Sequence, residues 1–178
     1  MRTARSCTTG RYWIPVTHCP LDPAFAHSCL SLAHSFYHSY VSPDKCVTDY
    51  RTRFSGIRPH HIKNAPKKRD VVAKVRSMVA GRVLCGHAIH NDLDVLEIDH
   101  PETHIRDSSK YPRLMRHLPN GKLKPKKLSV LAAEELNLRI QADDCGHCSV
   151  QDARATMALY KKHEHDWEKW HRKTSAER

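Results

Sequence analysis

Helical and strand-like segments alternate along the chain from Ala65 onward, and this alternation limits the possible folds more than any other feature. Residues 65–78 have apolar side chains at helical spacing, and Gly81 stands where a helix typically ends. The apolar run 83–85 follows and predicts a short buried strand. Helices that alternate with buried strands indicate an α/β architecture, with helices packed on a central sheet.

The other predicted elements continue this pattern. We expect a strand over 36–41 that stops at the turn 42–44, a helix over 92–98 with Asn91 as its N-cap, and a strand over 103–106 that ends at Asp107. A basic loop over 111–125 and a helix over 128–138 follow. A final helix begins near Ser149, which forms an acidic version of the capping box with Asp152. Its predicted core face contains Ala153, Met157, Tyr160, Glu164 and Trp167.

The chain carries an excess of positive charge. It has 30 Lys and Arg residues against 19 Asp and Glu residues, which gives a formal net charge of +11. Such an excess indicates an anionic partner, and we expect a nucleic acid rather than a membrane surface. The candidate nucleic-acid-binding residues stand at the end of the predicted loop and just after it: Lys122, Lys124, Lys126 and Lys127.

Two further classes of protein are excluded by the sequence. No run of about 18 apolar residues occurs, so no transmembrane helix is predicted. The seven cysteines are odd in number and irregularly spaced, which is typical of a reducing compartment rather than a disulfide framework. Cys145 and Cys148 have the spacing of a thiol redox motif, but no proline follows Pro125 to complete a thioredoxin-type site.

Two segments place histidine and aspartate where α/β proteins bind their ligands. The segment 87–92 follows a predicted strand and ends in Asp92, and the segment 147–152 begins with His147 and ends in Asp152. A carboxylate there can hold a hard cation, and an imidazole beside it can take a proton from water. Each Asp is also a good helix-start residue without any metal. We interpret the two segments together as one candidate site.

These segments resemble motifs of a known family. From about Phe36 to Lys173 the chain resembles the DEDDh branch of the DnaQ-like 3′–5′ exonucleases, in the group of RNA exonuclease 4 and the interferon-stimulated 20 kDa exonuclease. The matching stretches occur in the family's order: VTDYRTRFSGI at 47–57, GHAIHND at 86–92, IRD at 105–107, KLS at 127–129 and HCSVQDA at 147–153.

The resemblance implies an RNase H-like exonuclease fold, with a mixed central sheet flanked by helices. It implies hydrolysis of RNA, or alternatively DNA, from the 3′ end with two divalent ions, Mg²⁺ or Mn²⁺. It also implies a location in the nucleus, with the nucleolus as one site within it. By motif position, Asp92 and Asp152 correspond to metal ligands and His147 to the catalytic general base. Asp107 corresponds to a recurrent position at a strand end, and we treat it as a candidate auxiliary residue.

One motif of the family is missing from this chain. The family's first motif, Asp-x-Glu on a central strand, has no counterpart, because the first Glu of the chain is Glu97 and Asp22 is followed by Pro23 and Ala24. Two of the four metal carboxylates are therefore absent, which halves the negative charge expected at the metal site. We expect an impaired nuclease in which the N-terminal strands are incomplete or replaced.

Three explanations of the missing motif remain open. Residues 1–35 come from an alternative or mis-assigned first exon, or the chain is a pseudo-nuclease that binds RNA without cutting it. Alternatively, residues 12–17 form a substitute strand, although Pro15 argues against a central position. We expect 1–35 to be an atypical, poorly ordered segment, 36–173 to be a partial exonuclease domain and 174–178 to be a tail.

Overall fold

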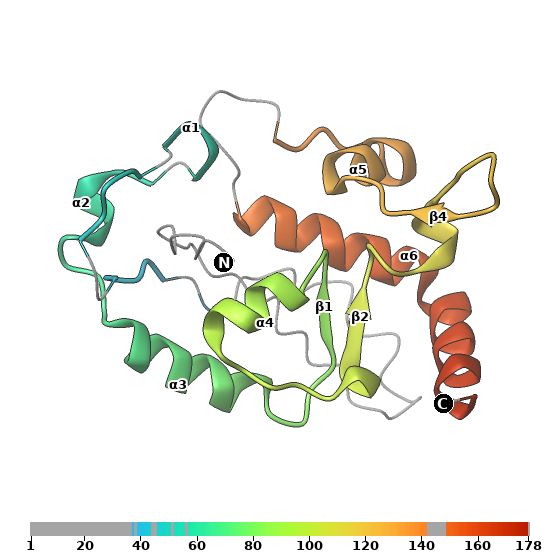
Figure 1. Ribbon diagram of the computed structural model, residues 1–178, viewed down its shortest axis with the longest axis horizontal. Coiled ribbons are helices and arrows are strands. Elements are labelled where there is room, and N and C mark those ends of the chain that lie inside the picture. The colour runs from blue at the N-terminus through green and yellow to red at the C-terminus, as the bar shows by residue number, and fades with distance from the viewer. Residues whose placement is uncertain are drawn as a thin grey trace, which may run out of the picture.

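Two short parallel strands, β1 (Leu84–Gly86) and β2 (Ile105–Asp107), lie near the centre of the molecule (Figure 1). The computed structural model describes residues 37, 39–43, 46–50, 52–55, 57–141 and 149–177. The strands pair Leu84 with Ile105, Cys85 with Arg106 and Gly86 with Asp107. Because the strands are parallel, their carboxyl ends meet at one edge of the sheet. Both predicted strands are thus confirmed, with bounds shifted by one or two residues.

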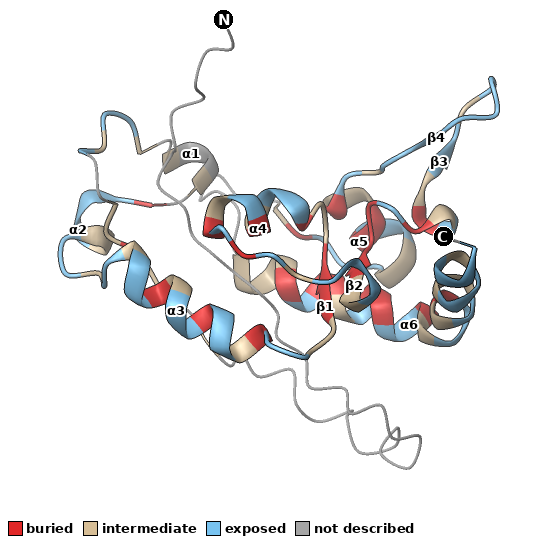
Figure 2. Ribbon diagram, turned by 60° about the horizontal axis from the view of Figure 1, so that its bottom comes forward, coloured by how far each residue is buried: buried red, intermediate tan, exposed pale blue. Residues whose placement is uncertain are grey.

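Helices cover both faces of this strand pair, as predicted for an α/β layer architecture. Leu84 packs into an apolar cluster with α3 (Lys68–Val79) and α4 (His90–Leu96), whereas the next residue, Cys85, packs into a second cluster with α5 (Leu128–Leu136) and α6 (Ser149–Ala176). Successive side chains of a strand point to opposite faces, so one three-residue strand joins the two cores. Figure 2 marks the buried residues of these elements in red.

The predicted helices α3 and α5 are confirmed. Helix α3 buries Val71, Val75 and Val79 at the predicted helical spacing. Gly81 follows it with a φ of +67°, a left-handed conformation that costs glycine little. Helix α5 ends at Leu136, two residues earlier than expected, because Asn137 adopts the left-handed conformation that stops the helix.

Helix α6 is the longest described element, with 28 residues. It buries Ala153, Ala155, Thr156, Leu159, Tyr160, His163 and Trp167. The predicted face is therefore largely right, although Met157 and Glu164 are only half-buried. The predicted capping box is wrong: Ser149 is already helical, and its buried Oγ has no hydrogen-bond partner among the described residues. The helix continues to Ala176, past residue 173.

The segment before α3 differs from the predicted pattern. Within the described part of 36–41 there is no regular strand, and nearby Ser42 forms only an isolated bridge with Lys67. Two one-turn helices follow, α1 (Thr52–Ser55) and α2 (Pro59–Ile62). Residues 1–36, including the proposed substitute strand at 12–17, lie outside the described residues. None of the described helices is long and apolar enough to cross a membrane.

The predicted loop at 111–125 contains regular structure. A 3₁₀ turn over Pro112–Leu114 precedes an antiparallel hairpin of β3 (Arg116–His117) and β4 (Leu123–Lys124). Each strand has only two residues, and the turn between them contains Pro119 and Gly121. Such short strands cannot give an alternating apolar pattern, which explains why this hairpin was not predicted.

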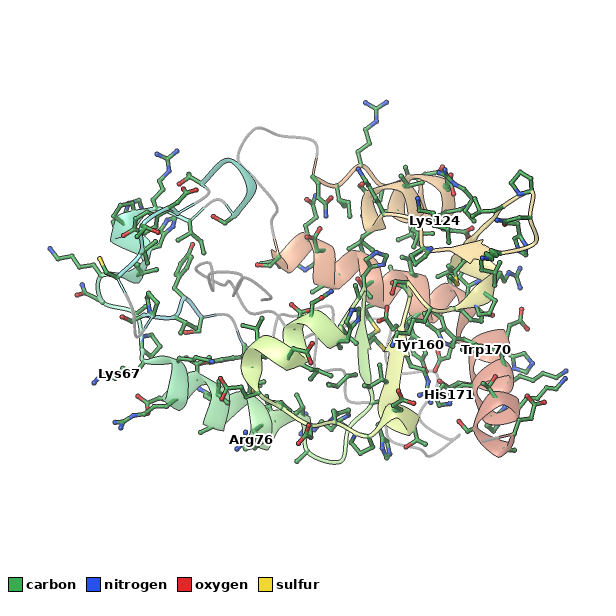
Figure 3. The ribbon with its side chains drawn as sticks, viewed as in Figure 1. Lys67, Arg76, Lys124, Tyr160, Trp170 and His171 are labelled. Carbon is green, nitrogen blue, oxygen red and sulfur yellow. The ribbon has the colours of Figure 1, made fainter. Side chains whose placement is uncertain are left out.

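A buried ion pair joins β2 to the far part of α6. Arg106 donates from Nε to Glu168 Oε1 at 2.6 Å and from Nη2 to Glu168 Oε2 at 2.8 Å. The Tyr160 hydroxyl donates to the same Oε1 at 2.9 Å, and Arg106 Nη1 lies 3.1 Å from His171 Nε2. Figure 3 shows Tyr160, Trp170 and His171 near one another along α6. This network aligns β2 against the helix that carries Asp152.

Candidate functional site

The turn between β1 and α4 is tight and strained. A Cβ on Gly86 would lie 2.8 Å from Ile89 Cβ and Cδ1, closer than carbon atoms can approach, so only glycine fits there. Ala88 has a φ of 56°, which is unfavourable for a residue with a Cβ. The strained turn places the start of α4 beside the carboxyl end of β2. Helix α4 begins at His90 with Ile89 as N-cap, so the predicted N-cap at Asn91 is wrong.

The Asp107 carboxylate holds this turn in place. Its Oδ1 accepts hydrogen bonds from Ala88 N at 2.8 Å, Ser109 N at 2.9 Å and Ser109 Oγ at 2.7 Å. Its Oδ2 accepts one from Ile89 N at 3.2 Å. Ile89 has no side-chain acceptor, so the N–H groups of Asn91 and Asp92 donate to the backbone oxygens of Ala88 and Ile89, while the Asp107 carboxylate binds the two N–H groups that precede the helix. Asp107 is buried and is satisfied by the protein itself.

Asp92 lies in the first turn of α4, close enough to Asp107 for their charges to interact. The pKa of Asp92 is raised from 3.8 to about 6. Burial is the largest cause, the negative charge of Asp107 adds to it, and the nearby His90 acts against it. A raised pKa means that the ionised carboxylate is unfavourable in this environment, and binding of a cation or a proton reduces that unfavourable energy. Asp92 is thus placed near Asp107, at the carboxyl ends of β1 and β2.

His87 links this edge to Asp152. Burial lowers the pKa of His87, and the charges of Asp107 and then Asp152 act against that shift, so the ring lies near both carboxylates. His87 Nδ1 lies 2.9 Å from Ser108 Oγ, and the Ser108 hydroxyl donates to Gly86 O at 3.0 Å. Because the Ser108 hydroxyl proton is already donated to Gly86 O, Ser108 Oγ must accept from His87. The Nδ1–H group of His87 therefore donates to Ser108 Oγ, and the Nε2 atom of the neutral ring remains an acceptor. Sequence analysis assigned no role to His87, although it lies inside the 87–92 segment.

Asp152 lies in the first turn of α6, where the sequence placed it. Gln141 Nε2 donates to its Oδ1 at 2.9 Å. The structure therefore places His87 near both Asp107 and Asp152, and Asp107 near Asp92. The predicted general base His147 and the Cys145–Cys148 motif lie outside the described residues, so their predicted roles stay predictions.

The metal ligands predicted from the sequence do not form a complete metal site among the described residues. Within the described residues, no group of three or more His, Cys, Asp or Glu side chains is placed to hold a metal ion. Asp107 already accepts four hydrogen bonds, and Asp92 and Asp152 are the other carboxylates that the sequence analysis predicted as metal ligands. Mg²⁺ commonly binds through one or two carboxylates together with water and a substrate phosphate. A second ion would need the carboxylates of the missing Asp-x-Glu motif.

The predicted basic residues lie on the hairpin and the segment after it. Lys122, Lys124 and Lys127 are exposed, and the described part of the chain gives them no ion-pair partner. Lys126 differs from them: it is half-buried and pairs with Glu134 at 2.7 Å. Three of the four candidate lysines are therefore exposed and form no ion pair with any residue that the structure describes.

The sequence comparisons identify the class of protein. Residues 28–160 match the RNase_T family, described as exonucleases, and the chain belongs to this family. Among its relatives, RNA exonuclease 4 of Xenopus tropicalis is 46% identical over 132 residues, which cover 74% of this chain and 31% of the relative. The human RNA exonuclease 4 is 43% identical, over 74% of this chain and 30% of the relative. The chain thus carries a 3′–5′ exonuclease domain of the RNA exonuclease 4 type and spans about a third of these relatives.

Solved structures agree with this assignment. The Saccharomyces cerevisiae Pan2 pseudoubiquitin hydrolase–RNA exonuclease module in complex with AAGGAA RNA matches with a TM-score of 0.64 and 29% identity, over 82% of this chain and 25% of that chain. The fold is therefore the predicted RNase H-like exonuclease fold of mixed helix and sheet.

Proposed function

We propose that this chain hydrolyses RNA from its 3′ end with the help of a divalent cation. The observation that carries the proposal is that Asp107, at the end of β2, lies near both Asp92 and His87, and that His87 also lies near Asp152, in a domain of the exonuclease family. RNA as the substrate is supported by relatives named RNA exonuclease 4 and by the RNA bound to the similar Pan2 module. DNA is the alternative substrate.

The chain's own residues have distinct roles in this proposal. Asp92 and Asp152 hold the cation, which when bound would stabilise negative charge on the phosphate oxygens. Asp107 holds the backbone turn that positions Asp92. His147 accepts a proton from the attacking water, and the Nε2 atom of His87 accepts a hydrogen bond from substrate or water beside Asp152.

We propose that hydrolysis is slow and that a high concentration of cation is needed. A site with two carboxylates attracts Mg²⁺ or Mn²⁺ less strongly than a site with four. The second candidate function, an RNA-binding pseudo-nuclease, is supported by the same missing motif. Both functions fit a nuclear location, which the basic clusters at 67–69 and at Arg113 and Arg116 favour as import signals.

Metal binding separates the two candidate functions. Electron paramagnetic resonance measures the fraction of Mn²⁺ that is bound as the protein is titrated, and so gives the Mn²⁺ affinity. We expect this affinity to be at least tenfold lower in Asp92→Asn and in Asp152→Asn than in the parent protein. Asp94→Asn is the matched control, because Asp94 is an exposed residue of the same helix α4. Equal Mn²⁺ affinity in all four proteins would exclude the carboxylate site and leave the RNA-binding function.

A further inference from the structure

We infer that the β3–β4 hairpin is a second RNA-contact surface, which binds the backbone of the substrate strand several nucleotides upstream of its 3′ end. This inference rests on the proposed function and extends it, because it assigns the enzyme a minimum substrate length. Its evidence is separate from the acidic site: the shape of the hairpin, its charge, and its position along α6.

The hairpin projects from the body of the domain (Figure 2). Its strand residues Arg116, His117, Leu123 and Lys124 are all exposed, so neither face of the ribbon is covered by the core. The turn is closed by a hydrogen bond from Gly121 N to Leu118 O at 3.0 Å, and Gly121 has a φ of +75°. This left-handed glycine after a four-residue turn is typical of a well-formed hairpin. The ribbon is therefore a defined structure that exposes its backbone and side chains to a partner.

Every charged side chain of the hairpin is positive. Residues 116–127 include one Arg, four Lys and no Asp or Glu. An exposed edge strand with unbalanced lysines is also a device against aggregation, so charge alone does not define a binding surface. The surroundings of the hairpin decide between these two interpretations.

The acidic residues near the hairpin are already neutralised by other cations. Asp166 pairs with Arg113 at 2.6 Å, Glu134 pairs with Lys126 at 2.7 Å, and Glu135 pairs with Lys162 at 2.9 Å. Within the part of the chain that the structure describes, no ion-pair partner is left for Arg116, Lys122, Lys124 and Lys127. Four uncompensated positive charges on one ribbon and its stem favour a polyanion, and the family membership identifies it as nucleic acid.

The position of the hairpin on α6 gives its separation from the acidic site. The Arg113–Asp166 ion pair ties the segment just before β3 to α6. Asp152 stands 14 residues before Asp166 on the same helix, which corresponds to about 21 Å at a rise of about 1.5 Å per residue. A stacked strand advances about 3.4 Å per nucleotide, so roughly six nucleotides span this distance. The hairpin therefore contacts long substrates and misses very short ones.

Fluorescence anisotropy with two labelled RNAs tests this inference. The probes are 5′-fluorescein oligouridylates of three and twelve nucleotides, measured in chelator so that they are not cut. The test variant Lys122→Gln/Lys124→Gln is compared with Lys63→Gln/Lys67→Gln, which removes the same charge from exposed lysines around α2 and α3. Figure 3 shows Lys67 and Lys124 on opposite sides of the molecule.

We expect the hairpin variant to bind the 12-mer about tenfold more weakly, with a salt slope reduced by roughly 1.4 for two lost phosphate contacts. Its affinity for the 3-mer should equal that of the parent protein, and the control variant should match the parent with both RNAs. Equal losses in the two double variants, or no loss of 12-mer binding in the hairpin variant, would overturn the inference while leaving the acidic site intact. If the parent protein binds neither RNA, the proposed function fails together with this extension.

Discussion

The Asp107 carboxylate accepts a hydrogen bond of 2.8 Å from the backbone N–H of Ala88, a residue 19 positions earlier in the chain. Ala88 is in the left-handed conformation, so the strained residue of the β1–α4 turn is held by the neighbouring strand. Asp92 lies four residues further on, in the first turn of α4. The position of a candidate metal ligand thus depends on a carboxylate that has a structural role in the turn.

Substitution of Asp107 should loosen this turn. In Asp107→Asn, one carboxylate oxygen becomes an NH₂ group, which cannot accept the hydrogen bond from Ile89 N. An unsatisfied buried N–H costs about 1–3 kcal/mol, so we expect a loss of that size in the free energy of unfolding, measured by urea denaturation. Asp107→Ala leaves the N–H groups of Ala88, Ile89 and Ser109 without this acceptor and should cost more. Equal stability of Asp107→Ala and the parent protein would show that the turn does not depend on this carboxylate.

Substitution of Asp92 should stabilise the fold above neutral pH. The pKa of Asp92 is raised from 3.8 to about 6, so the folded state binds its proton more tightly than the unfolded chain does. The parent protein therefore loses stability as the pH rises from about 4 through about 6, and Asp92→Asn avoids this loss. At one pKa unit per about 1.36 kcal/mol, the variant gains up to about 3 kcal/mol at pH 8 in chelator and almost nothing at pH 3.5. A gain that does not depend on pH would contradict this explanation.

The buried ion pair between Arg106 and Glu168 should be far more sensitive than an exposed one. Glu168→Leu leaves the Arg106 guanidinium, whose side chain is 7% exposed, without its carboxylate, and we expect a cost of about 3 kcal/mol. Asp166→Asn is the control on the same helix, since it breaks the Arg113 pair, whose side chains are 59% and 55% exposed. That control should cost less than about 1 kcal/mol. Thermal unfolding of the two variants side by side measures the difference, and equal costs would contradict the structural role given to Arg106.

The His87 ring should carry its proton on Nδ1. The Ser108 hydroxyl donates to Gly86 O and can accept only from His87, and burial lowers the His87 pKa so that the ring is neutral at pH 7. The ¹⁵N chemical shifts of the ring should therefore show a protonated Nδ1 and an unprotonated Nε2. In Ser108→Ala this pattern should disappear. Detection of a protonated Nε2 in the parent protein would remove His87 as an acceptor at the site.

Sequence patterns predicted the elements that pack through side chains. The spacing of Val71, Val75 and Val79 locates α3, and the run at 83–85 locates β1, because both have apolar residues at the period of their structure. The start of α4 was misplaced at Asn91, because the turn before the helix is held by Asp107, which accepts from Ala88 N and Ile89 N and which no local pattern reveals. The hairpin was missed because its strands pair through the backbone and bury no side chain.

The candidate site was predicted only in part, because some of its residues depend on contacts between distant positions of the chain. Asp92 and Asp152 stand at helix starts that the sequence makes visible, so their positions followed from motif and spacing. The roles of His87 and Asp107 depend on partners 18 to 21 residues away, namely Ile89 and Ser108, and only the paired strands bring these together. The Arg106–Glu168 pair spans 62 residues and left no sequence signal.

The central claim is that Asp92 and Asp152 support cation-dependent removal of nucleotides from an RNA 3′ end. A 5′-labelled single-stranded RNA of about 20 nucleotides, incubated with Mn²⁺ and resolved at single-nucleotide resolution, tests it. We expect a slow ladder of products shortened from the 3′ end, which is absent in chelator and in Asp92→Asn and unchanged in the exposed control Asp94→Asn. RNA that stays at full length with Mn²⁺ while still binding the protein, or a ladder of equal rate in Asp92→Asn, would contradict the claim.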